Sequence, residues 1–86
     1  MGKRKKKIVI YVANVDVMID GRFNCTIRNH VFDMSKGPNN MIHDLFERIL
    51  TEKPYLQRVE EFTVIWNDKD GHEMKIDFTP NREINT

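Results

Sequence analysis

The 86-residue sequence contains one cysteine, Cys25, and no long run of hydrophobic residues. A single cysteine excludes an internal disulfide framework and a zinc finger built on cysteine pairs, and it is typical of proteins in a reducing compartment. A membrane-spanning helix needs roughly 20 consecutive apolar residues, and no segment approaches that length. The apolar stretch after the basic N-terminus is interrupted at Asn14 and Asp16, so we expect no secretory signal. These absences predict an intracellular protein, either cytoplasmic or nuclear.

The composition is that of one small folded domain. Hydrophobic residues make up 40% of the chain and charged residues 31%, which is too apolar for a fully disordered protein. A chain of this length can bury only one core. We divide it into a basic N-terminal arm over residues 1–7, a single α+β domain over residues 8–80 and a C-terminal tail over residues 81–86.

Positive and negative charges nearly cancel, with 14 lysine and arginine residues against 13 aspartate and glutamate residues, but they are separated along the chain. The arm is formed by five consecutive basic residues: Lys3, Arg4, Lys5, Lys6 and Lys7. Residues 60–86 contain seven acidic and three basic residues. This separation favours binding to a partner of complementary charge, including a second copy of the chain. It is equally compatible with charges that meet within the domain or only keep it soluble.

Residues 8–32 alternate in hydrophobicity with the period of β-strands, around a turn signal at Asp20-Gly21. The apolar phase shifts across Ala13-Asn14, which indicates either a β-bulge or a strand buried on both faces near its start. A connection centred on Gly21 is favoured over a two-residue turn, because it places apolar residues on one face of the hairpin. The expected pairs are Ile19 with Phe23, Val17 with Cys25, and Val15 with Ile27.

A helix is predicted from residue 41, where apolar residues recur at positions 41, 42, 45, 46, 49 and 50. Ser35 to Pro38 break the strand pattern before it, and Asn39 or Asn40 is the expected helix cap. Pro54 prevents the helix from continuing and can start a short second turn.

A second hairpin is predicted around the tip Lys69-Asp70-Gly71, where glycine provides the positive φ that the turn requires. Alternating apolar residues flank the tip and predict the pairs Phe62 with Phe78, Val64 with Ile76, and Trp66 with Met74. The resulting order is β-β-α-β-β. We therefore expect an α+β fold in which a single amphipathic helix packs across one four-stranded sheet.

The sequence predicts no catalytic, metal or cofactor site. The three histidines and Cys25 are scattered over different expected elements, without the spacing of a zinc site or of a nucleophile with its base. Tyr11 is expected to be exposed beside the arm. Four other aromatic residues are expected in the core, namely Phe23, Phe46, Trp66 and Phe78. We therefore expect a protein that is not an enzyme.

The segment from Trp66 to Ile76, WNDKDGHEMKI, resembles the acidic hairpin of PB1 domains, a family with a ubiquitin-like β-grasp fold. That hairpin follows the pattern aromatic-x-Asp-x-Asp/Glu-Gly-Asp/Glu and continues with alternating apolar residues. The β-β-α order and a lysine before the first strand, Lys7, also agree. The resemblance implies a module in which the acidic hairpin of one copy binds a first-strand lysine of another.

This resemblance assigns the acidic face to Asp68, Asp70 and Glu73. Three features depart from the family pattern. His72 stands at a position that is usually acidic, and the acidic cluster that follows it in the family is reduced to Glu83. The sequence after Pro80 is also too short for the final strand that β-grasp folds add parallel to the first.

We therefore expect a non-enzymatic protein–protein interaction module with opposed basic and acidic surfaces, which extends to self-association. The basic face comprises Lys3, Arg4, Lys5, Lys6 and Lys7, and no membrane span is expected. Two alternatives remain open at this point. One is a small nucleic-acid-binding protein that uses the basic arm, and the other is a viral-type accessory or inhibitor protein.

The nucleic-acid alternative makes a quantitative prediction. Five basic residues in contact with duplex DNA give a plot of log K against log salt concentration with a slope of roughly −4 to −5. Gel-shift titrations at several salt concentrations measure this slope. A gel shift that is unchanged when residues 2–7 are deleted contradicts the alternative.

Overall fold

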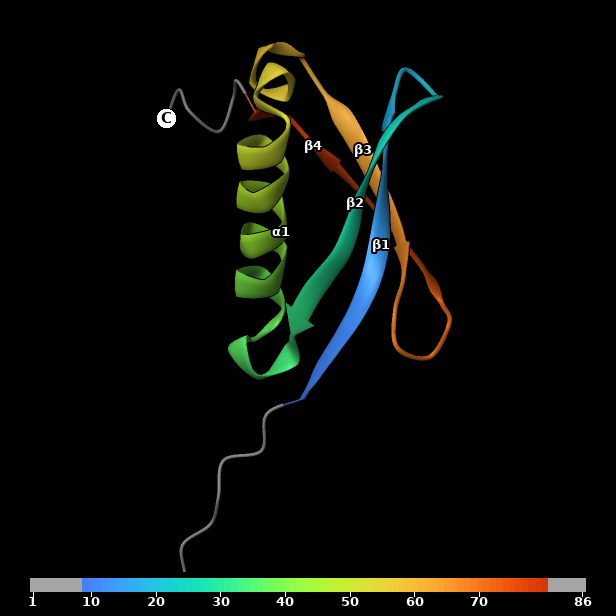
Figure 1. Ribbon diagram of the computed structural model, residues 1–86, viewed down its shortest axis with the longest axis vertical. Helices are drawn as coiled ribbons and strands as arrows, with labels where there is room; N and C mark the ends of the chain where they lie inside the picture. The colour runs from blue at the N-terminus through green and yellow to red at the C-terminus, as the bar shows by residue number, and fades with distance from the viewer. Residues whose placement is uncertain (1–8, 81–86) are drawn as a thin grey trace, which may run out of the picture.

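The computed structural model describes residues 9–80, which form one sheet with a helix across one face (Figure 1). The strands are β1 (Ile10–Ile19), β2 (Arg22–Asp33), β3 (Phe62–Asn67) and β4 (Glu73–Phe78), and the helix is α1 (Pro38–Glu52). Two short 3₁₀ turns flank the helix, η1 (Met34–Lys36) and η2 (Pro54–Arg58). This order confirms the predicted β-β-α-β-β fold. The basic arm and the C-terminal tail lie outside the described residues.

The two hairpins form one antiparallel sheet with the order β2-β1-β3-β4. β1 pairs with β2 along nearly its whole length, but it pairs with β3 only over residues 16–18. All neighbouring strands among the described residues are antiparallel, so these four strands lack the parallel pair that a β-grasp fold places at its first strand. The likeness to PB1 domains therefore stays a prediction.

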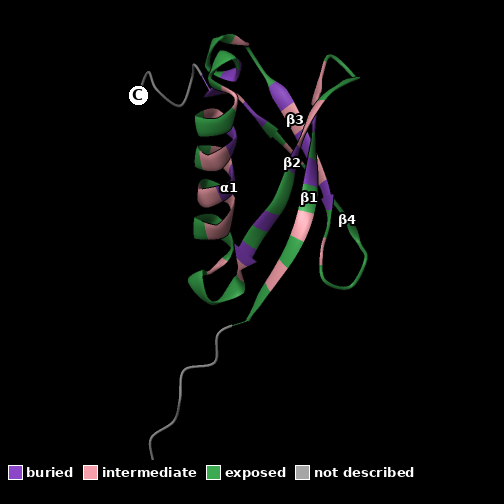
Figure 2. Ribbon diagram, viewed as in Figure 1, coloured by how far each residue is buried: buried purple, intermediate pink, exposed green. Residues whose placement is uncertain are grey.

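The core lies between the sheet and α1, and Figure 2 shows buried positions along the strands and on the helix. Leu45 and Ile49 of α1 and Leu56 of η2 are fully buried. They share one core with residues of all four strands: Val15, Val17, Ile27, Phe32, Phe62, Val64, Trp66 and Phe78. A two-stranded hairpin is only marginally stable alone, so burial of apolar surface against the helix is what stabilises both hairpins.

The helix begins earlier than its apolar pattern indicated. Pro38 occupies the first turn, where its missing N–H is not needed and its fixed φ already suits a helix. Gly37 precedes it with a φ of 90°, and no side chain caps the helix, so the expected cap by Asn39 or Asn40 is wrong. Asn40 Nδ2 instead donates a hydrogen bond to the backbone oxygen of Lys36, at 3.0 Å. The short turn expected after Pro54 is confirmed as η2.

The β1–β2 hairpin turns through two residues. Asp20 and Gly21 have φ angles of 52° and 76°, and Ile19 pairs with Arg22. Positive φ at both central residues matches the right-handed twist of the flanking strands, and Asp-Gly is a favoured pair for such a turn. The expected pairing of Ile19 with Phe23 is therefore wrong.

A bulge next to this turn restores the apolar register. Val17 pairs with Cys25 as predicted, whereas the next residue, Met18, pairs with Phe23, which leaves Asn24 as the extra residue. Side chains alternate between the two faces of a strand, so one extra residue moves Phe23 to the face opposite the core. Phe23 is 62% exposed, so its expected place in the core is wrong.

A second irregularity lies where the sequence suggested a bulge, but the extra residue belongs to β2. The register shifts between Ala13 and Val15, opposite Arg28 and Asn29. Asn29 has a φ of 55°, and its N–H donates a hydrogen bond to Asn14 Oδ1 at 2.9 Å. Asparagine tolerates this left-handed conformation better than most residues, which explains why the bulge forms here.

Because the extra residue lies in β2, β1 keeps one face toward the core along its whole length. Tyr11 is on that face, half-buried, so its expected exposure is wrong. Its ring stacks on Phe32 with centroids 4.8 Å apart, and its hydroxyl accepts a hydrogen bond from Trp66 Nε1 at 3.2 Å. Ile10 and Val12 therefore belong to the outer face of the sheet and are 53% and 54% exposed.

The β3–β4 hairpin agrees with the sequence prediction at every predicted pair. Phe62 pairs with Phe78, Val64 with Ile76, and Trp66 with Met74. Gly71 at the tip has a φ of 86°, the positive value that the turn requires.

The packing of α1 on the sheet generates a stability prediction. Ile49→Ala leaves a cavity in the core and is expected to lower the free energy of unfolding by about 2–5 kcal/mol. Glu47→Ala, on the exposed side of the same helix, should change it by less than about 0.5 kcal/mol. Urea unfolding followed by circular dichroism measures both variants. Equal effects of the two substitutions would contradict this packing.

Candidate functional site

The acidic β3–β4 loop, predicted as an acidic face, is closed by one of its own carboxylates. Asp68 Oδ1 accepts hydrogen bonds from the backbone N–H groups of Asp70 and His72, both at 2.9 Å. These bonds stabilise the carboxylate and hold the pKa of Asp68 below its usual value, with His72 the largest contributor. Asp68 therefore organises the loop, and only part of its carboxylate remains accessible to a partner.

The other two predicted acidic residues are open to solvent. Asp70 and Glu73 are both exposed, although Lys69 Nζ lies 3.6 Å from Asp70 Oδ1. Ligand atoms of Asp68, Asp70 and His72 lie within 4.8 Å of one another, which is a spacing that a metal ion could use. The hydrogen bonds of Asp68 already account for this cluster as a closed turn, so we assign no metal site to it.

The acidic loop lies at the end of the sheet where β1 begins. Antiparallel pairing of Asp16 with Ile65 and of Met18 with Thr63 directs the start of β1 and the end of β3 toward the same end. Figure 1 shows the β3–β4 loop and the start of β1 at that end. Lys7 precedes Ile10 by three residues, which span at most about 11 Å of extended chain. The basic arm is therefore attached at the same end as the acidic loop.

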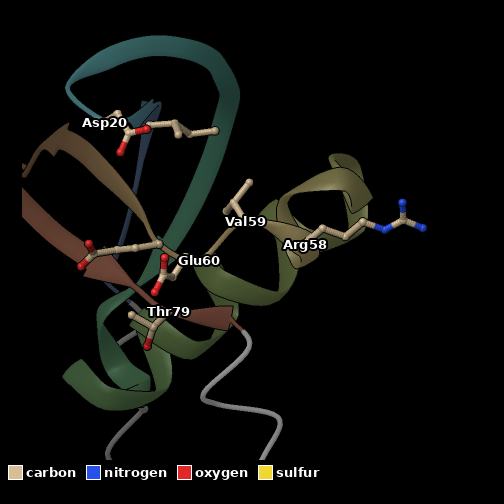
Figure 3. Close-up of a pocket in the computed structure, with 7 residues that line it drawn as sticks. Asp20, Arg58, Val59, Glu60 and Thr79 are labelled. Atoms are coloured by element: carbon tan, nitrogen blue, oxygen red, sulfur yellow. The ribbon is translucent and has the colours of Figure 1, made fainter.

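A groove of about 840 Å³ lies at the opposite end, between the β1–β2 turn and the segment that joins η2 to β3 (Figure 3). We call it the Asp20 groove. Its lining combines apolar, acidic and basic side chains: Ile19, Asp20, Arg58, Val59, Glu60, Glu61 and Thr79. The pairing of Met18 with Thr63 brings the turn close to the start of β3 and so creates the groove.

The Asp20 groove is acidic. It has three carboxylates, from Asp20, Glu60 and Glu61, against the single guanidinium of Arg58. Within residues 9–80, none of these carboxylates takes part in an ion pair. Figure 3 shows Asp20 across the groove from Glu60, while the Arg58 side chain extends away from both. The groove can therefore accept cationic groups.

Sequence reasoning did not single out the Asp20 groove. Glu60 and Glu61 contribute to the acidic C-terminal third, and Asp20 was assigned only to a turn signal. These residues are about 40 positions apart in the sequence, and only the β1–β3 pairing brings them together. The predicted basic face, Lys3 to Lys7, lies outside the described residues.

His30 of β2 is a buried polar residue that sequence reasoning placed only at a strand end. It is 5% exposed, and its Nε2 has no hydrogen-bond partner among the described residues. Its ring packs edge-on against Phe32, with centroids 4.7 Å apart. Burial lowers the pKa of His30 and the nearby charge of Arg48 lowers it further, whereas Asp44 and Glu52 oppose this shift. The surroundings of His30 therefore favour the neutral imidazole over the charged one.

Arg48 connects α1 to the β2 bulge beside His30. Its guanidinium donates hydrogen bonds to the backbone oxygens of Arg28, at 3.1 Å, and Asn29, at 3.4 Å. It also forms an ion pair with Glu52, one helical turn later, at 2.8 Å. These bonds satisfy carbonyl groups at the irregular part of β2 and explain why a cation is close to the buried imidazole.

The remaining candidates for chemistry are separated in the fold. Cys25 is half-buried against the core, as expected for a small apolar side chain. His43 is exposed on α1, with Nε2 3.9 Å from Glu47 Oε2. His72 is in the β3–β4 loop. Cys25, His43 and His72 thus belong to three different parts of the structure and do not converge on one site.

The burial of His30 predicts a pH dependence of stability. Burial holds the pKa of folded His30 below its ordinary value of 6.5, so the unfolded chain binds the proton more readily. The free energy of unfolding should therefore fall as the pH is lowered from 6.5 through the folded pKa. His30→Leu should remove this slope, whereas His43→Leu, which changes an exposed histidine, should retain it. Urea unfolding between about pH 5 and pH 7.5 measures the slope.

The carboxyl groups of Asp33 and Asp68 titrate below this pH window. The pKa values of Asp33 and Asp68 are lowered from 3.8, so the stability that they contribute is complete above that value and is lost only at more acidic pH. An unchanged slope in His30→Leu would contradict the assignment.

Comparisons with protein-family models, with curated protein sequences and with solved structures find no match to this chain. Among the described residues, no helix is both long and apolar enough to span a membrane.

Proposed function

We propose that this protein is a non-enzymatic interaction module that binds another protein, including a second copy of itself, through surfaces of opposite charge. The observation that carries the proposal is the Asp20 groove, where three carboxylates share a hollow without an ion-pair partner among residues 9–80. The same chain carries five consecutive positive charges in its arm. Complementary charges of this kind accelerate association and select the partner.

The charge distribution of the described residues supports a protein partner over nucleic acid. Residues 9–80 contain twelve acidic and eight basic residues. A domain of this sign repels phosphate groups, so the nucleic-acid alternative depends on the arm alone. A cationic segment of another protein is attracted by the same surface.

The resemblance to PB1 domains supports the proposal through Asp70 and Glu73, whose carboxylates are exposed on the β3–β4 hairpin. Asp68, the third residue of the predicted acidic face, is engaged in closing the loop. The acidic loop lies at the end of the sheet where β1 begins and the arm is joined. The Asp20 groove, at the other end, is therefore the acidic surface that lies opposite the arm's point of attachment.

Salt-dependent self-association tests the proposed function. The Debye length is ~30 Å at about 0.01 M salt and ~3 Å at about 1 M salt. Contacts between opposite charges therefore form at the low salt concentration and are screened at the high one. We expect the average mass of the wild-type protein in sedimentation equilibrium to rise with protein concentration at low salt and to be that of a monomer at high salt.

The matched variant lacks residues 2–7 and should remain a monomer under both conditions. A wild-type protein that is monomeric at every salt concentration would contradict the proposal. Association that persists at high salt would also contradict it, because apolar contacts are not weakened by screening.

A further inference from the structure

We propose that the Asp20 groove binds the basic arm of a second copy of this chain, which joins molecules head to tail. The inference rests on the proposed function and identifies the acidic surface that the arm recognises. The occupant is the segment from Lys3 to Lys7, which is the only run of five consecutive basic residues in the sequence.

The groove has the size and lining to hold a short extended segment. Its volume of about 840 Å³ lies within the range of roughly 300–1,000 Å³ that is typical of ligand-binding clefts. Ile19 and Val59 provide an apolar part of the lining, and Thr79 adds a hydroxyl group. A lysine side chain fits such a surface because its methylene stem packs on apolar groups while its ammonium group remains near polar ones.

The charges of the groove complement those of the arm. Asp20, Glu60 and Glu61 leave the groove with a net negative charge even after Arg58 is counted. Individual exposed ion pairs contribute little, so one lysine would bind only weakly. Several consecutive cations opposite three carboxylates form a network, and the compact ammonium group with its three donors can adapt to each carboxylate.

Chain length prevents the arm from occupying the groove of its own molecule. The groove lies at the end of β1, nine residues beyond Ile10, which is about 30 Å along a strand. An extended chain advances at most about 3.6 Å per residue, so Lys7 reaches only about 11 Å from Ile10 and Lys3 about 25 Å. Only the first charge approaches its own groove. The arm as a whole can bind there only in a second molecule.

The acidic β3–β4 loop is the competing site. It lies at the end of the sheet where β1 begins, so the length of the arm is sufficient to reach it within the same molecule. Asp68 is engaged in backbone hydrogen bonds and Lys69 lies beside Asp70, so this loop offers fewer free carboxylates than the groove. The Asp20 groove is therefore the stronger receptor for an arm.

Head-to-tail binding uses two different surfaces on each molecule, so it continues into chains or closes into rings. This geometry allows a test by complementation. One variant lacks residues 2–7 and keeps an intact groove. The groove variant, Glu60→Gln/Glu61→Gln, keeps an intact arm. The matched control is Asp70→Asn/Glu73→Gln, which removes the same number of charges from the β3–β4 loop.

In sedimentation experiments at low salt, the groove variant should bind about tenfold more weakly than the wild-type protein, whereas the loop control should retain its association. At protein concentrations too low for this weakened association, the arm-deleted and groove variants should each be monomers. Their mixture should form one-to-one dimers and nothing larger, because the pair contains one usable arm and one usable groove. Unchanged circular dichroism and urea midpoints confirm that the variants are folded.

The outcomes separate this inference from the proposed function. If the loop control loses association and the groove variant keeps it, the arm binds the β3–β4 loop; the inference is then overturned while the proposed function stands. A mixture that remains monomeric, or association that disappears after nuclease treatment, also overturns the inference. A wild-type protein that never associates overturns the proposed function itself.

Discussion

The pairing of β1 with β3 over residues 16–18 joins the two hairpins and determines where the acidic β3–β4 loop and the Asp20 groove lie relative to the start of β1. Because the strands are antiparallel, the start of β1 lies near the β3–β4 loop, and the end of β1 lies near the start of β3. The first relation places the start of β1, to which the basic arm is joined, at the end of the sheet that carries the acidic loop. The second forms the Asp20 groove at the far end of the sheet. A shift of this register by one residue would turn Val17 or Val64 out of the core, so the apolar packing fixes the register.

The second hairpin could be predicted in detail from the sequence because its strands alternate without interruption. Every expected pair from Phe62–Phe78 to Trp66–Met74 is present, and the glycine at the tip has the required positive φ. Local information is sufficient here, since the alternation and the turn residue indicate the same register.

The first hairpin was predicted only in part, because two extra residues in β2 change the phase of the pattern. The sequence signalled the irregularity near Asn14, but it could not show that the extra residue belongs to the other strand. Near the turn, the extra residue Asn24 allows Val17 to pair with Cys25 as expected, although the turn itself has only two residues. The same extra residue places Phe23 outside the core. The Asp20 groove could not be predicted, since it depends on contact between segments about 40 residues apart.

The fold determines where the separated charges of the sequence lie relative to one another. A near-neutral chain has one compact run of cations and two acidic surfaces, of which only the β3–β4 loop is within reach of the same molecule's arm. Binding at the loop would neutralise charge within a monomer, whereas binding at the Asp20 groove would link molecules. Chain length thus allows the arm to reach the loop within a monomer, whereas the groove can take the whole arm only from a second molecule.

Arm binding is measured most directly by nuclear magnetic resonance with an isotope-labelled protein that lacks residues 2–7 and a synthetic peptide of residues 1–9. We predict that the peptide shifts the amide signals of Asp20, Glu60, Glu61 and Thr79, and that about 1 M salt abolishes these shifts. Shifts confined to Asp68–Glu73, or no shifts at all, would contradict binding of the arm in the Asp20 groove.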